Sequence, residues 1–147
     1  MLISRRGAFA RLLAALGGAS LAARPAAAAI TAGVPKVAYH LADLDKVAFV
    51  LGNIENHIAG EGGKVEIVLV VHGPALAMFQ TAKANADITR RLASIVKAGV
   101  NLAACGNTMN AQKVSIADLL PGFVRVDEGG VVRLARLQAE GYAYLRP

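Results

Sequence analysis

The sequence predicts a doubly wound α/β domain with a mostly parallel, five-stranded sheet and helices on both faces. Three observations lead to this fold class. Five short apolar segments alternate with segments whose apolar residues recur at helical spacing. Residues 65–71 read Val-Glu-Ile-Val-Leu-Val-Val, and such a β-branched run is typical of a strand that is buried on both faces of a parallel sheet. The chain of 147 residues is long enough for one domain with an ordinary core.

Local signals justify the first half of this prediction. Residues 36–41 form a short apolar strand, and a helix follows it because five apolar residues lie on one helical face: Val47, Val50, Leu51, Ile54 and Ile58. Asp43 or Asp45 is the expected cap of this helix. After the strand at 65–71, residues 75–84 are predicted to be helical. Asn85 or Asp87 then starts a further helix, which Gly99 ends.

The second half begins with a strand at 100–105 and a helix at 107–113. Ser115 and Asp118 have the spacing of a capping box and indicate one helical turn. The last elements are a strand at 123–126, a helix at 130–140 and an alternating strand at 142–145, which we expect at a sheet edge. The commonest strand order at this size is 2-1-3-4-5. Its ligand-binding crevice lies between the carboxyl ends of strands one and three.

The first 29 residues are predicted to be an export signal, and the domain to span residues 36–147. Arg5 and Arg6 precede a weakly apolar run, and an alanine-rich tract suited to signal peptidase follows it. The run has about 12 residues, whereas a membrane span needs ~20, so no stable anchor is expected. The arginine pair resembles a twin-arginine signal. Phe9 comes one position later than that pattern has it, so general secretory export is the alternative. We expect a periplasmic protein, cleaved near residue 29.

Most of the net charge of +6 belongs to the predicted signal. Four of the 16 basic residues lie in residues 1–29, which contain no acidic residue; this leaves 12 basic against 10 acidic residues, a net charge of +2. No basic cluster interleaved with aromatic residues remains, so nucleic-acid binding is not expected. Three histidines and one cysteine, far apart in the sequence, match no zinc spacing. We expect neither a metal nor a cofactor.

Cys105, the only cysteine, is the candidate nucleophile. It follows an apolar strand and precedes a Gly-Asn-Thr turn, so the free N–H groups of the next helix would favour a thiolate. The backbone of Gly106 and Asn107 and the hydroxyl of Thr108 are the candidate anion-stabilising groups. Two alternatives stay open. Cys105 would be a small core residue, and Asn107 and Thr108 would only cap the helix.

His72 and His40 are the candidate acid–base residues, because both end predicted strands and therefore lie on the same sheet edge as Cys105. Hydrogen bonding to loop carbonyls is the alternative for both. His57, Arg90 and Arg91 are expected on solvated helix faces. The loop after the first strand lacks the hydroxyl groups of a flavin phosphate site, so a flavin electron carrier is not favoured.

The chain resembles the DsrE/DsrF-like sulfur-relay family from about Lys36 to Pro147. Three segments carry the resemblance: residues 70–74 (Val-Val-His-Gly-Pro), residues 104–109 (Ala-Cys-Gly-Asn-Thr-Met) and residues 130–144, which begin Gly-Val-Val-Arg-Leu. The resemblance implies a five-stranded α/β fold and a homo-oligomer, a trimer or a hexamer. It also implies a cysteine that carries sulfane sulfur as a persulfide and passes it to a partner protein; by motif match that cysteine is Cys105.

We therefore expect a periplasmic sulfur carrier or sulfurtransferase whose partners are a sulfur donor and an acceptor, either proteins or small sulfur species. A lone cysteine suits this role better than disulfide exchange, which needs a second, resolving thiol. The alternative is a non-catalytic oligomeric binding module whose strand-end crevice holds a small anion or a peptide.

Overall fold

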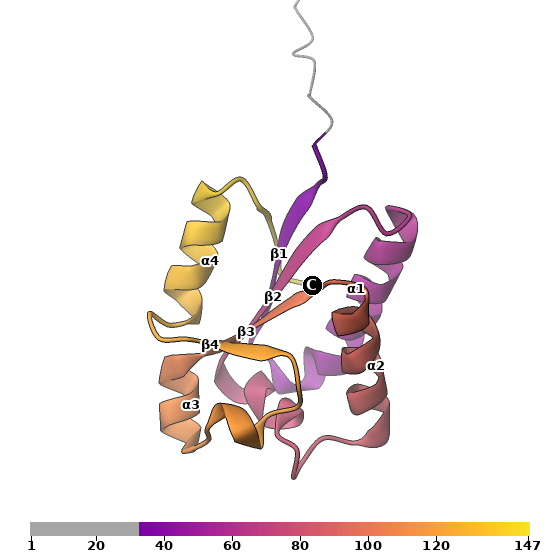
Figure 1. Cartoon of the computed structure of the whole chain (residues 1–147). Coiled ribbons are helices and arrows are strands. Elements are labelled where there is room, and N and C mark those ends of the chain that lie inside the picture. Colours follow the sequence, from indigo (N-terminus) through magenta and orange to yellow (C-terminus); the bar gives the residue numbers. More distant parts are fainter. Residues whose placement is uncertain (1–32) are drawn as a thin grey trace, which may run out of the picture. The chain divides into compact units, whose positions relative to one another are not determined.

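The structure is a computed structural model that describes residues 33–147, so the predicted export signal lies outside the described residues. Within these residues, nine regular elements follow one another in chain order: β1 (Lys36–Leu41), α1 (Val47–Gly60), β2 (Glu66–Val71), α2 (Ala86–Lys97), β3 (Asn101–Cys105), α3 (Gly106–Gln112), β4 (Phe123–Val126), α4 (Gly130–Ala139) and β5 (Ala143–Leu145). Figure 1 labels all of them except β5. Three 3₁₀ helices join them: Leu44–Lys46, Gly73–Phe79 and Ile116–Asp118. Among the described residues, no helix has the length and apolar character needed to cross a membrane.

The α/β class is confirmed, and all five strands are parallel, but the strand order is β4-β3-β2-β1-β5. The expected order 2-1-3-4-5 would have placed β2 at an edge. In the structure β2 is central, and its residues 68–71 are buried on both faces. All three residues of β5 are exposed, which suits the edge position beside β1. The point at which strands are added on the opposite side of β1 therefore lies between β1 and β5, and not between β1 and β3 as expected.

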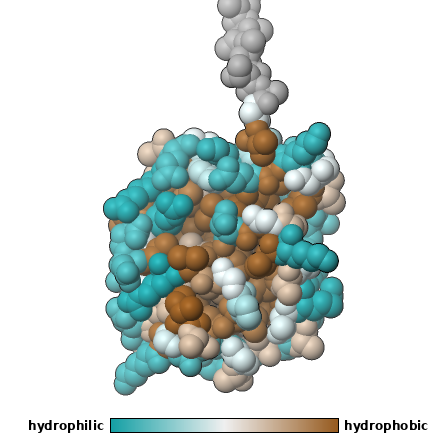
Figure 2. Space-filling view, viewed as in Figure 1, coloured by the Kyte–Doolittle hydropathy of each residue, from teal (hydrophilic) through white to brown (hydrophobic). Residues whose placement is uncertain are grey.

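Within residues 33–147, the two faces of the sheet are covered unequally, because α4 is the only helix that packs on one of them. On the other face α1, α2 and α3 bury the larger core, which includes Leu51, Leu92 and Met109. On the α4 side, Leu134 and Leu137 cover the middle of the sheet. A groove of about 650 Å³ remains between α4 and the end of α2. In the view of Figures 1 and 2, hydrophobic residues gather in the middle of the molecule, between α4 and α2.

Two of the predicted helix starts are confirmed by their hydrogen bonds. Asn85 caps α2 by accepting from the amide of Ile88 at 2.9 Å, and Ser115 and Asp118 form the capping box. The predicted helix at 75–84 is wrong in type and extent. Only a 3₁₀ helix forms there, and it ends at Phe79, because Gln80 is extended and pairs with Leu119.

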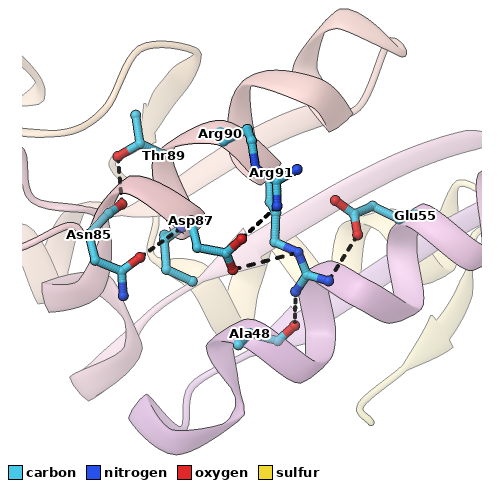
Figure 3. A network of polar contacts seen from close by, with 8 residues as sticks. Ala48, Glu55, Asn85, Asp87, Thr89, Arg90 and Arg91 are labelled. Carbon is cyan, nitrogen blue, oxygen red and sulfur yellow. Dashed lines mark hydrogen bonds and ion pairs between the residues drawn. The ribbon is translucent and has the colours of Figure 1, made fainter.

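Arg91 lies between α1 and α2 and does not extend into solvent as expected (Figure 3). It donates to the carbonyl of Ala48 at 2.8 Å and lies 3.2 Å from the carboxylate of Glu55 and 3.8 Å from that of Asp87. Its side chain is 24% exposed, whereas that of Arg90 is 70% exposed. The spacing of residues on α2 could not distinguish the two arginines, since the difference depends on where α1 lies.

Two other predicted surface roles also differ in the structure. Asp43 makes no capping hydrogen bond; its carboxylate instead pairs with Arg146 at 3.0 Å. His57 is partly buried, and its Nδ1 lies 2.9 Å from the hydroxyl of Tyr39, a buried residue of β1. Both contacts join parts of the chain that are far apart in sequence.

Candidate functional site

The strand order places four chemically active side chains in a row along the carboxyl edge of the sheet. Val71 of β2 pairs with Ala104 of β3, so the next residues, His72 and Cys105, are neighbours. Side chains two residues apart on a strand point to the same face. Because Ala38, Val70 and Ala103 pack beneath α4, the residues two positions further along also face α4. In spatial order from β5 to β3, the row is Tyr144, His40, His72 and Cys105.

His40 is the centre of a hydrogen-bonded chain within this row. Its Nδ1 lies 2.6 Å from the hydroxyl of Tyr144, and its Nε2 makes a short hydrogen bond with Nε2 of His72. The planes of the two imidazole rings lie at 21° to each other, with the ring centroids 4.6 Å apart. Burial, followed by the charges of His72 and Arg146, lowers the pKa of His40 to about 4. Burial and Arg146 also lower the pKa of His72, against the opposing effect of Asp43. Both rings are therefore neutral at neutral pH.

Cys105 lies at the start of α3 and is only 6% exposed. Burial raises the pKa of its thiol, but hydrogen bonding from four donors outweighs burial, so the pKa is lower than usual. The donors are the hydroxyl and amide of Thr108 and the amides of Gly130 and Asn107. The side chain of Cys105 makes no capping hydrogen bond of ideal geometry to α3. The environment favours a thiolate.

The start of α4 lies directly against this row. A Cβ atom on Gly130 would come within 3.3 Å of the Cβ of His72 and 3.4 Å of the Cβ of Cys105. Gly129 has a φ of +91°, and a Cβ there would lie 2.7 Å from Nδ2 of Asn107. Two successive glycines therefore allow the first turn of α4 to contact both the cysteine and the histidine, and to direct an amide at the sulfur.

The structure thus brings together the predicted residues His40, His72, Cys105, Asn107 and Thr108. The hydroxyl of Thr108 also accepts a hydrogen bond from the amide of Gly73 at 2.9 Å, which joins α3 to the segment after His72. Gly106 has a different position: it is buried against β4, where a Cβ would lie 2.9 Å from the carbonyl oxygen of Val126.

Sequence reasoning missed two residues of the site, Gly130 and Tyr144. A Gly-Gly pair before a helix was a usable signal for the first. Tyr144 had no local signal, since it reaches the row only because β5 lies beside β1. Within residues 33–147, no group of three or more histidine, cysteine or carboxylate residues is arranged to hold a metal ion.

Comparison with known proteins agrees with this architecture. The sequence profile of the DsrE/DsrF-like family matches residues 18–147. No curated protein matches the sequence. Among solved structures, the chain is similar to MTH1491 from Methanobacterium thermoautotrophicum, a protein of unknown function, with 28% identity and a TM-score of 0.68 over 77% of this chain and 99% of that one.

Two more distant structures share the fold. The protein ychN from Escherichia coli has 14% identity and a TM-score of 0.54, over 76% of this chain and 99% of its own. The protein BT1422 from Bacteroides thetaiotaomicron, whose function is also unknown, has 16% identity and a TM-score of 0.58, over 76% of this chain and 94% of its own. At these identities the likeness shows the fold alone.

Proposed function

Because this chain belongs to the DsrE/DsrF-like family, we propose that it is a sulfur carrier that holds sulfane sulfur as a persulfide on Cys105. The observation that supports this most directly is the set of donors around the sulfur, which lowers the pKa of the thiol although the residue is buried. The thiolate is the form of cysteine that attacks sulfur. A cysteine that served only as core packing would need none of these donors.

The charging step transfers one sulfur atom without net oxidation. The Cys105 thiolate attacks the outer sulfur of a donor persulfide, R–S–SH. The new S–S bond forms as the donor S–S bond breaks, which leaves Cys105–S–SH and the thiolate R–S⁻. The Thr108, Gly130 and Asn107 donors that stabilise the thiolate also stabilise it as the leaving group when the persulfide is discharged. Discharge reverses the step, with an acceptor thiolate as the nucleophile and Cys105 as the leaving group.

Intact mass measurement tests this proposal. After incubation with a low-molecular-weight persulfide, the protein should gain ~32 Da, the mass of one sulfur atom, on the peptide that contains Cys105. Cys105→Ser is the control and should gain nothing. Absence of the gain, together with an alkylation rate no higher than that of a free thiol, would refute the carrier role.

One observation favours the alternative of a binding module, namely that Cys105 is only 6% exposed. In that role the crevice would hold its ligand without bond formation, and Cys105→Ala would keep full activity in cells. Loss of activity in Cys105→Ala, with the fold retained by circular dichroism, would exclude the binding module and favour the carrier.

We further propose that the carrier is a periplasmic homo-oligomer, a trimer or a hexamer. The signal-like pattern in residues 1–29 supports the location, and cell fractionation tests it. The groove beside α4 supports self-association, because Val124 on edge strand β4 is 66% exposed and lines the groove. Val124→Asp should reduce the mass of the assembly measured by native mass spectrometry. Val131→Asp, at an equally exposed position outside the groove, should leave it unchanged.

A further inference from the structure

We propose that Tyr144, His40 and His72 form a proton relay that accepts the proton of an incoming thiol beside Cys105 and passes it to solvent at the β5 edge of the sheet. The inference rests on the proposed carrier function and assigns Tyr144 a role in the discharge step. The carrier needs such a relay because an acceptor thiol must lose its proton before it attacks the persulfide.

The hydrogen bonds provide a continuous route. The hydroxyl of Tyr144 and Nδ1 of His40 are 2.6 Å apart, and Nε2 of His40 is hydrogen-bonded to Nε2 of His72. Tyr144 is 40% exposed and so opens the route to water, whereas His40 is 9% exposed. Each ring nitrogen of His40 thus has one partner, as a relay through an imidazole requires.

The inner end of the route is Nδ1 of His72. This atom has no hydrogen-bond partner within residues 33–147, although every fully buried side-chain nitrogen or oxygen in that part of the chain has one. It is therefore accessible. The ring also packs against Gly130, whose other neighbour is Cys105. His72 and Cys105 lie on adjacent strands and both border Gly130, so a thiol that approaches the persulfide on Cys105 comes close to the neutral ring of His72.

The proton transfers balance at every atom. Before transfer, the N–H of His72 Nε2 donates to His40 Nε2, and the N–H of His40 Nδ1 donates to the Tyr144 oxygen. A proton that arrives at Nδ1 of His72 moves each of these protons one partner outward, and Tyr144 releases its original hydroxyl proton to water. Both rings end neutral with the opposite tautomer, and the same hydrogen bonds persist with donors and acceptors exchanged.

The charges around the route favour this neutral mechanism. Arg146 disfavours a second positive charge on either ring, while Asp43, its ion-pair partner at 3.0 Å, partly offsets that effect. Because the rings stay neutral at neutral pH, His72 is available as a base. Tyr144 acts only through His40 and is a relay residue rather than a catalytic one.

The test compares Tyr144→Phe with wild type in the discharge of persulfidated Cys105 to a small thiol across a range of pH. General acid–base catalysis typically raises a reaction rate by ~10²–10⁴-fold. Removing the Tyr144 hydroxyl interrupts only the outer end of the relay, so the discharge rate should fall by about tenfold at pH 7. Above the pKa of the acceptor thiol no proton needs removing, so the two rates should converge there. Charging of the Cys105 thiolate by the donor persulfide R–S–SH requires no deprotonation of an acceptor thiol, so its rate should be unchanged.

Tyr142→Phe is the matched control, since the Tyr142 hydroxyl donates to Glu66 at the opposite end of the sheet; its discharge should match wild type. Equal discharge in Tyr144→Phe and wild type overturns the relay, and so does slowing by the same factor at every pH. If wild-type Cys105 takes up no sulfur, the carrier proposal fails, and the relay is tested separately by ¹⁵N NMR of His40. Ring-nitrogen shifts unaffected by Tyr144→Phe overturn it.

Discussion

Replacing Thr108 with valine should slow the alkylation of Cys105 and destabilise the domain at the same time. The hydroxyl donates toward the sulfur and accepts from the amide of Gly73 at 2.9 Å. Valine keeps the shape of threonine and removes both functions. The pKa of Cys105 should therefore rise relative to wild type, and the amide of Gly73 should lose its partner.

The magnitudes follow from ordinary hydrogen-bond energies. A hydrogen bond to a charged group contributes ~1.5–3 kcal/mol, and ~1.4 kcal/mol corresponds to a factor of ten, so the acid ionisation constant of the Cys105 thiol should fall at least about tenfold. Leaving an amide without a partner costs ~1–3 kcal/mol of stability. Alkylation by iodoacetamide from pH 5 to pH 10 measures the first effect, and urea unfolding measures the second.

Thr108→Ser separates the hydroxyl from the methyl group, because serine keeps the donor and the acceptor. Its alkylation profile should stay close to that of wild type. If Thr108→Val alkylates at the wild-type rate over the whole pH range, the hydroxyl does not stabilise the thiolate, and the donor argument for Cys105 fails. A stability loss without a change in alkylation would assign Thr108 to structure alone.

Three further predictions concern packing, backbone strain and pH. Arg91→Ala should lower the free energy of unfolding by about 1–2 kcal/mol, because it removes one hydrogen bond to a carbonyl and two ion pairs. Arg90→Ala, which removes one exposed ion pair, should lower it by less than ~0.5 kcal/mol. Urea unfolding measures both changes. Gly129→Ala should destabilise the domain by ~1–3 kcal/mol and alter Cys105 alkylation, because its new methyl group would lie 2.7 Å from an amide nitrogen. Gly141→Ala, with a similar φ of +89° and open space around it, should leave alkylation unchanged. Burial first, and then neighbouring charges, lowers the pKa of His40 from 6.5 to about 4. Between these two pH values the unfolded chain binds more protons than the folded chain, so the free energy of unfolding should fall as the pH drops through this range. His40→Gln should weaken this pH dependence, measured as the urea midpoint.

The elements of the fold could be predicted locally, but the order of its strands could not. The uninterrupted apolar run of β2 indicated burial on both faces, and the capping residue Asn85 marked the start of α2 within one residue. The residues of a strand do not indicate on which side of β2 the following strand of the chain pairs. The order is set by the strand pairings, β2 between β1 and β3 and β5 beside β1, and these pairings form only in the assembled sheet.

The same distinction holds for the site. Cys105, Asn107 and Thr108 are close in sequence, so the strand-to-helix pattern was enough to group them. His40 and His72 could be placed at the same edge, because parallel strands share their carboxyl ends. Tyr144 reaches the site because β5 pairs with β1, and Gly130 reaches it because α4 packs against the sheet; both arrangements depend on long-range packing. Their roles could not be predicted from their neighbours in sequence.

The turns at the amino ends of the strands offer places for attaching a probe. Gly62, Gly99 and Gly141 all have open space around them, but each has a positive φ, so a probe would be inserted beside the glycine and not in its place. They lie at the end of the sheet opposite Cys105, so a fluorophore or an affinity tag inserted there would report on the molecule without touching its sulfur.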